Sequence, residues 1–303
     1  MLTWLTDPLQ LEFMRQAIAI AVLLGILCAI TGSYLIVQQM GMMGHVISHS
    51  ILPGLSIAFF FQIDLAIGAF IAGSLSALSV AWIHSQSRVK ADAAMALVVS
   101  GFLALGVMLI TLLNTTQLNL DEILFGNILG VTSRDLWQTL GITLLVVILV
   151  KLFYKELLFY TFDPLGAQAC GLPITGLYLG LIAVITLTVI ASIQTVGVLL
   201  VIALLIAPST TAYLLVKELH WMMITAAIIG IISGVGGMYL SYYANVPSGP
   251  AIVLLGIGCF LLAFLFSPSQ GIVTRPESRH RLVVFFHRLV NRLVTANKFT
   301  AKK

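Results

Sequence analysis

Two histidines four residues apart carry the clearest chemical signal in this sequence of 303 residues. His45 and His49 lie near the start of a long apolar stretch, and on a helix this spacing places both side chains on one face. Imidazole nitrogens arranged in this way can bind one Zn²⁺ or a similar transition-metal ion. Two histidines at a helix end could instead form hydrogen bonds with the backbone or with water. Spacing alone leaves both interpretations open, because a histidine pair is a weak motif.

Pro53 follows the pair and strengthens the metal interpretation. Proline has no amide hydrogen to donate to the carbonyl four residues earlier, so in a continuous helix the carbonyl of His49 is left free. A free carbonyl beside an imidazole suits a hydrated cation. A packing kink at Pro53 and Gly54 would produce the same pattern. We therefore predict that Pro53 lines a cation pathway, with a kink as the alternative.

A second proline interrupts the apolar segment LLIAPSTTA. Pro208 would free the carbonyl of Leu204 in the middle of a helix, and Ser209 is its neighbour in sequence. Both residues could line the same pathway as the histidines. The adjacent hydroxyl groups could instead satisfy the freed backbone, which is the common role of Ser and Thr near such breaks.

The composition indicates which elements hold these residues. Of all residues, 60% are hydrophobic and 9% are charged, whereas about a quarter are charged in a soluble globular domain. Four runs lack Asp, Glu, Lys and Arg, and each holds at least one span of roughly 20 apolar residues. The predicted spans are 14–37, 46–63, 65–83, 93–113, 136–154, 175–193, 195–216, 221–243 and 249–267. We therefore expect an all-α, polytopic transmembrane helical bundle of nine spans, or of eight if one short span is re-entrant.

Basic residues orient the predicted spans. Two spans separate each basic loop from the next, so all of these loops lie on one side, which is the cytoplasm because Lys and Arg favour it. The basic positions are Arg88, Lys90, Lys151, Lys155, Lys217 and the tail from Arg275. This predicts a transmembrane permease domain over 1–274 and a basic cytoplasmic tail over 275–303. Helical spacing in the tail fits an amphipathic surface helix, with a disordered segment as the alternative.

Several function classes fit the sequence poorly. There is no Gly-Lys dipeptide, so the chain lacks a Walker A phosphate loop and does not hydrolyse ATP by that machinery. An intramembrane zinc protease would need a glutamate where Val46 stands. The basic excess is concentrated in the tail, which reflects membrane orientation and not nucleic-acid binding. A secondary metal transporter stays open on composition, although the acidic residues that such proteins use for ion coupling lie only at span ends here.

The cytoplasmic loop at 162–173 contains the signals of a short helix. Asp163 is a natural N-cap, Pro164 suits the first helical turn, and Gly171 with Pro173 ends the helix. About two turns are thus delimited within a loop. From these residues alone, such a helix could simply cover the loop at the membrane interface.

Three patches together resemble the permease family of manganese, zinc and iron ATP-binding-cassette importers. They are MGHVISHSILPGLSIAF at 43–59, FDPLGAQACGLP at 162–173 and SIQTVGVLLVIALLIAPSTTAYLL at 192–215. In that family the first patch usually reads Gly-Asp-x-x-x-His, and the Asp and His are implicated in metal passage. His49 matches the family histidine, whereas His45 replaces the aspartate and removes a negative charge from the path.

The resemblance also implies an assembly and a substrate. It implies a homodimeric importer permease in the bacterial cytoplasmic (inner) membrane, with two ATP-binding-cassette ATPase subunits inside and an extracytoplasmic metal-binding protein outside. The second patch matches the helix that docks onto the ATPase, so the expected coupling residues are Asp163, Ala167, Gly171 and Pro173. The expected cargo is manganese, with zinc or iron as alternatives, and no cofactor is expected to be bound permanently. The chain is expected to be a transport subunit and not an enzyme.

Overall fold

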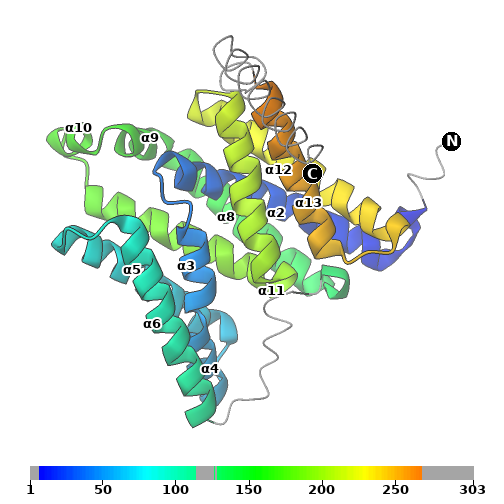
Figure 1. Ribbon diagram of the computed structural model, residues 1–303, viewed down its shortest axis with the longest axis horizontal. Helices are drawn as coiled ribbons and strands as arrows, with labels where there is room; N and C mark the ends of the chain where they lie inside the picture. Colours follow the sequence, from blue (N-terminus) through cyan, green and yellow to red (C-terminus); the bar gives the residue numbers. More distant parts are fainter. Residues whose placement is uncertain (1–6, 114–125, 127, 268–303) are drawn as a thin grey trace, which may run out of the picture.

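The computed structural model of the protein describes residues 7–113, 126 and 128–267 (Figure 1). Its helices are α2 (Glu12–Val37), α3 (Met43–Ser50), α4 (Leu52–Phe60), α5 (Leu65–Gln86), α6 (Ala91–Leu112), α8 (Ser133–Leu152), α9 (Tyr154–Phe162), α10 (Pro164–Ala169), α11 (Ile174–Leu215), α12 (Leu219–Ala244) and α13 (Ser248–Phe266), with short 3-10 turns η1 (Pro8–Gln10) and η2 (Ile128–Gly130). No strand occurs in these described ranges, which agrees with the predicted all-α class. The predicted tail helix within 275–303 lies outside the described residues.

Within the described residues, eight helical units are long and apolar enough to cross a membrane. They are α2, α3 with α4 (Met43–Phe60), α5, α6, α8, α11, α12 and α13. The predicted spans match these helices to within a few residues at most ends, because uncharged apolar runs mark them directly. The polytopic helical bundle is therefore confirmed. The sequence reasoning did not predict α9, which lies in the expected cytoplasmic loop.

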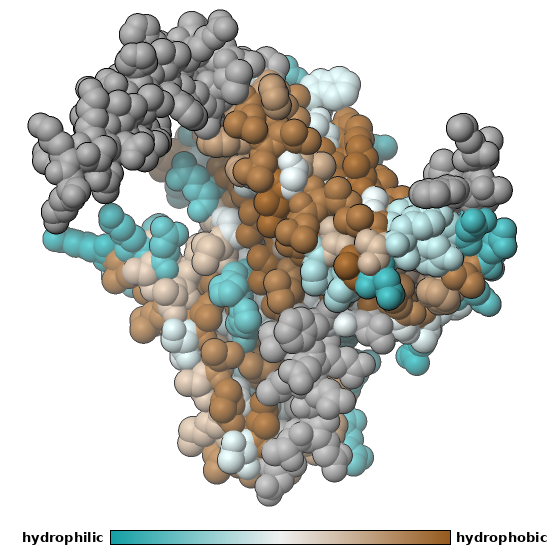
Figure 2. Space-filling model, turned by 45° about the vertical axis from the view of Figure 1, so that its right-hand side comes forward, coloured by the Kyte–Doolittle hydropathy of each residue, from teal (hydrophilic) through white to brown (hydrophobic). Residues whose placement is uncertain are grey.

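Apolar side chains cover much of the surface, as the bilayer requires. Figure 2 shows one face on which hydrophobic residues form a broad area, with hydrophilic residues toward its edges. Exposed apolar side chains include Leu254 and Leu262 of α13 and Leu97 and Met108 of α6. A patch of this kind is unusual on a soluble monomer, whereas lipid tails accept it readily.

The longest helix, α11, has 42 residues and is broken at Gly197. Gly197 has a φ of 78° and a ψ of 164°, a conformation that glycine adopts far more easily than other residues. Residues 174–196 and 198–215 are thus two helical segments, about 34 Å and 27 Å long at 1.5 Å per residue. Each is close to the roughly 30 Å thickness of the hydrocarbon core. Figure 1 shows the two segments meeting at an angle, and we predict that each of them crosses the membrane.

Two groups of helices pack against α11. One group consists of α3, α4, α5 and α6, which pack against one another. The other consists of α2, α8, α12 and α13. Because α11 contacts α3 and α5 as well as all four helices of the second group, it is the element that both groups share (Figure 1).

Small residues bring α4 and α5 into close contact within the first group. Gly54 and Gly68 face each other, and a Cβ on either glycine would collide with the carbonyl oxygen of the other. Close backbone approach of this kind is a common way for membrane helices to associate, because burying apolar side chains gains little in lipid. Gly54 follows Pro53 directly, so the kink predicted there has a packing role.

The break in α11 makes a topological prediction. If α11 crosses the membrane twice, Cys170 after α10 and Lys217 after α11 lie on the same side. In chains that retain one cysteine each, exposed Cys170 and Lys217→Cys should both react with a membrane-impermeant maleimide in inside-out vesicles only. Val246→Cys, in the turn between α12 and α13, should react from the opposite side. Labelling of Cys170 and Lys217→Cys from different sides would show a single crossing.

Candidate functional site

The histidine pair lies on α3, just before an interruption of the helix. α3 ends at Ser50 and α4 begins at Leu52, with Pro53 in the first turn of α4. Proline suits that position because its missing amide hydrogen would have no helical partner there. The imidazole ring centroids of His45 and His49 are 4.4 Å apart, with an interplanar angle of 61°. The predicted helical face with two neighbouring imidazoles is therefore present.

The pair occupies the accessible side of α3. Six other residues of this helix are buried, whereas His45 and His49 are each half-buried. The buried residues are Met43, Gly44, Val46, Ile47, Ser48 and Ser50. The packing of α3 against α5, α6 and α11 therefore leaves its histidine side as the one that an ion or a second protein chain can reach.

One chain supplies an incomplete ligand set. Zinc in proteins usually has four ligands at about 2.0–2.3 Å. Among residues 7–113, 126 and 128–267 there is no group of three or more His, Cys, Asp or Glu side chains that could hold a metal ion. A tetrahedral ion at this pair would thus need ligands from water or from another chain.

Unpaired hydroxyl groups lie on both sides of His49. Ser48 and Ser50 are buried, and their Oγ atoms have no hydrogen-bond partner within the described part of the chain. Leaving a buried polar group unpaired costs about 1–3 kcal/mol, so most such groups in folded proteins have a partner or an ordered water. The segment around His49 is therefore more polar than its packing within one chain can satisfy.

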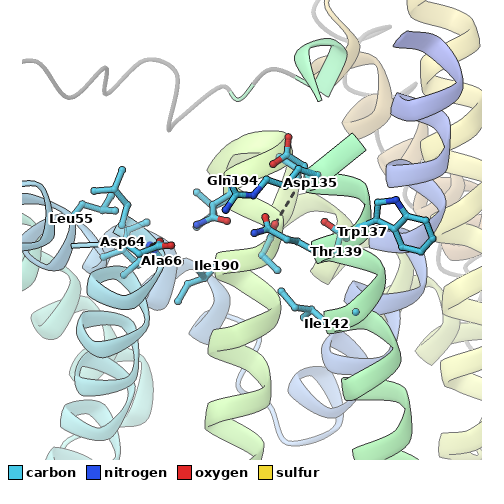
Figure 3. A pocket seen from close by; sticks show the side chains of 18 of the residues that line it. Leu55, Asp64, Ala66, Asp135, Trp137, Thr139, Ile142, Ile190 and Gln194 are labelled. Carbon is cyan, nitrogen blue, oxygen red and sulfur yellow. Dashed lines mark hydrogen bonds between the residues drawn. The ribbon is translucent and has the colours of Figure 1, made fainter. Parts of the chain in front are cut away.

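A large cavity opens beyond the end of α3 (Figure 3). It has a volume of about 1090 Å³, and Ile51, two residues after His49, forms part of its wall. Figure 3 shows Asp64 and Ala66 on one side, Asp135 and Thr139 on the other, and Gln194 of α11 between them. The polar lining residues are Gln62, Asp64, Arg134, Asp135, Gln138, Thr139, Gln194 and Thr195.

The two carboxylates of the cavity also have structural roles. Asp64 caps α5, because its Oδ1 accepts a hydrogen bond from the amide of Ala66 at 2.8 Å. Asp135 completes a capping box at the start of α8, where its Oδ2 accepts a hydrogen bond from the amide of Thr132 at 2.9 Å. Both acids are thus fixed at the cavity wall. Sequence reasoning missed this cavity because three distant segments form it, and no local motif marks such a meeting.

Pro208 and Ser209 pack away from α3. Pro208 lines a small void between α11, α12 and α13, and the Oγ of Ser209 lies against Gly32 of α2. Leu205 is the residue of this segment whose side chain lies closest to Gly44 of α3. The neighbouring hydroxyls bond within α11, since Thr211 Oγ1 donates to the carbonyl of Ala207 at 2.6 Å. The predicted pathway role of Pro208 and Ser209 gains no support from these contacts.

The predicted short helix in the cytoplasmic loop is present as α10. The Oδ1 of Asp163 accepts a hydrogen bond from the amide of Gly166 at 2.8 Å, as expected for an N-cap. Gly171 ends the segment with a φ of 80°. Ala167, which we expected to approach a partner closely, is instead fully buried within the chain. Leu165 of the same helix is 79% exposed, so it is the apolar side chain that α10 presents outward.

Known proteins resemble this chain over most of its length. Residues 10–267 match the family described as ABC 3 transport family. The chain is 44% identical over 275 residues to the manganese transport system membrane protein MntC of Halalkalibacterium halodurans, covering 90% of this chain and 94% of that protein. It is 38% identical over 274 residues to the chelated iron transport system membrane protein YfeD of Yersinia pestis, with coverage of 89% and 91%. Its fold is similar to PsaBC from Streptococcus pneumoniae in complex with Fab, with a TM-score of 0.80, 36% identity and coverage of 89% and 98%.

The histidine pair can be tested by metal binding to the purified chain. His49→Ala should weaken the binding of Zn²⁺ in competition with a colorimetric chelator by about tenfold or more, since loss of an outer-shell partner alone costs 10–100-fold. His45→Asp should retain binding, because a carboxylate is also a ligand. Binding to the wild type should weaken as the pH falls, because protons compete with the metal ion for imidazole nitrogen. The exposed His84 supplies the control, and an equal loss in His84→Ala would contradict the assignment.

Proposed function

This chain belongs to the ABC 3 transport family, and from that premise we propose that it is the membrane permease subunit of an ATP-driven importer of divalent transition-metal ions. Membership of a transport family makes the chain a transport subunit and not an enzyme. Its spans make it a multi-pass protein of the bacterial inner membrane. The observation that carries the proposal is the pair of imidazoles on the accessible side of α3, in a bundle of otherwise apolar helices.

A second copy of the chain would complete the ligand set. The proposed homodimer places two histidine pairs around a shared axis, and four imidazoles satisfy the coordination number that one chain cannot. Closed two-fold symmetry is also the commonest arrangement of protein oligomers. The accessibility of the histidine side of α3 supports this placement.

Manganese is our first proposal for the cargo, because the relative with 44% identity carries that metal in its name. Iron stays a candidate through the relative named for chelated iron, and zinc through the chemistry of the site. His45 bears on this choice, since carboxylates suit Mn²⁺ whereas imidazole suits Zn²⁺ and Fe²⁺. The ion is cargo here, so the site must bind it weakly enough to release it.

The proposed partners lie on both sides of the membrane. An ATP-binding-cassette ATPase would dock onto α10, where Leu165 is exposed, as is Phe162 at the end of α9. The chain lacks a Walker A loop, so the ATPase has to be a separate subunit. An extracytoplasmic metal-binding protein would deliver the ion on the opposite side, where the cavity between α5, α8 and α11 opens.

Uptake measurements test the proposed function. Cells that lack this chain should take up ⁵⁴Mn²⁺ at background level, and expression of the chain should restore uptake. We expect His49→Ala to keep its level in the membrane and to stay at background, because a ligand of the path is gone. The degree to which unlabelled Zn²⁺ or Fe²⁺ reduces the uptake of ⁵⁴Mn²⁺ ranks the three ions as cargo. Wild-type uptake by His49→Ala would contradict the site, and uptake that continues after ATP depletion would favour a secondary transporter.

Docking onto α10 makes a separate prediction. Leu165→Arg should leave the permease in the membrane, yet reduce the ATPase that copurifies with it and reduce uptake about tenfold or more, because a charge replaces an apolar contact. Ala167→Arg should lower the amount of folded permease instead, since Ala167 is buried within the chain. Val246→Arg on the opposite side of the membrane is the control. Retention of the ATPase by Leu165→Arg would exclude this docking surface.

A further inference from the structure

A hydrogen bond joins the end of α2 to the arm that carries α10. We call α9 and α10 together, residues 154–169, the cytoplasmic arm; it lies at the upper left of Figure 1. Gln38 directly follows α2, and its Nε2 donates to the Oγ1 of Thr161 at 3.2 Å. Thr161 lies in the last turn of α9, two residues before the N-cap of α10. The bond therefore connects the short helix α10 to the start of the segment that leads to α3.

The turn between Gln38 and α3 is held by its own hydrogen bonds. The amide of Met40 donates to the carbonyl of Leu35 at 2.8 Å, and the amide of Met43 donates to the carbonyl of Met40 at 2.8 Å. Met43 is the first residue of α3 and is fully buried, and His45 follows in the first helical turn. Hydrogen-bonded backbone therefore links Gln38 to the start of the helix that carries the histidine pair.

The other end of the arm lies near a carboxylate of a neighbouring element. Burial raises the pKa of Tyr154, the first residue of α9, and the nearby carboxylate of Glu218 raises it further. Glu218 precedes α12, so the start of the arm lies beside the turn between α11 and α12. The start of the arm therefore lies near the turn before α12, and its far end is the one that bonds to Gln38.

We propose that Gln38 and Thr161 are positioning residues whose hydrogen bond transmits movement of α10 to the histidine pair. The inference rests on the proposed function, because it requires an ATPase that moves α10. A hydrogen bond of 3.2 Å is already near the long end of the normal range, and lengthening by a few tenths of an ångström removes it. Movement of α9 therefore either carries Gln38 with it or breaks this bond.

An equivalent bond at the other end of α2 provides a matched control. The Nε2 of Gln16 donates to the Oγ of Ser133 at 3.1 Å, which joins α2 to the start of α8. In both bonds a glutamine Nε2 at one end of α2 donates to a hydroxyl oxygen, at 3.1 Å for Gln16 and at 3.2 Å for Gln38. The Gln16 bond, however, leads neither to α10 nor to α3. If loss of either bond simply loosens α2, Gln16→Leu and Gln38→Leu should lower metal transport alike. If the Gln38 bond transmits movement, only Gln38→Leu should lower it.

The test measures metal transported per ATP hydrolysed in proteoliposomes that contain the permease, its ATPase and the metal-binding protein. Gln38→Leu and Thr161→Val should each lower the ratio of Mn²⁺ imported to ATP hydrolysed about fivefold, the factor expected for one hydrogen bond. ATP hydrolysis itself should continue, because α10 and its docking surface are unchanged. Thr161→Ser keeps the hydroxyl and should keep the wild-type ratio. The double variant should be no worse than either single variant, since both substitutions remove the same bond.

The outcomes separate this inference from the proposed function. Wild-type ratios in Gln38→Leu and Thr161→Val would overturn the inference while leaving the importer intact. Equal losses in Gln16→Leu and Gln38→Leu would overturn it too, because they would indicate general loosening of α2. Additive losses in the double variant would show that the two side chains do not act through one bond. A wild-type complex that hydrolyses ATP without importing metal would overturn the proposed function first, and the inference with it.

Discussion

Within a bilayer, a backbone amide or carbonyl finds no water, so every such group needs a partner in its own helix or in a neighbouring element. The described part of this chain meets that constraint with long helices, and two of the interruptions fall at Ile51 and at Gly197. Both residues are buried in protein, which shields the interrupted backbone from lipid. Next to the second break, Thr195 Oγ1 donates to the carbonyl of Ser192 at 3.0 Å. The first break falls directly after the histidine pair, so the chain departs from a regular helix where its polar chemistry lies.

The same constraint explains how much of the fold could be predicted from the sequence. Spans follow from uncharged apolar runs, because a charge inside the bilayer is costly, and the N-cap at Asp163 follows from local chemistry. α9 escaped prediction because it is short and mixes charged residues such as Lys155 with aromatic ones. The direction of Ala167 could not be predicted either, since six helical residues are too few to establish an apolar face. The cavity at Asp64 and Asp135 depends on tertiary contacts between distant segments, which no local pattern records.

Two properties of α3 meet at the candidate site. Its packed side contacts α5, α6 and α11, whereas its histidine side presents two ligands and needs more to complete a metal site. The sequence identified the ligands, because two imidazoles at helical spacing share a face wherever the helix lies. It could not identify which side of the helix stays accessible, because that depends on the small residues that let neighbouring helices approach. Gly73 of α5 is one of these: a Cβ there would lie 3.1 Å from side-chain atoms of Ile47 and Thr186.

The bonds of Gln16 and Gln38 have a mechanical consequence for α2 itself. One end of this helix is tied to the start of α8 and the other to α9, and α8 and α9 are separated by a single residue. The three helices thus form a closed triangle with hydrogen bonds at two corners and the chain at the third. α2 therefore cannot shift along its own axis without breaking one of these two hydrogen bonds. A shift of α9 that keeps the Gln38 bond would therefore move the end of α2 sideways, across the helix axis.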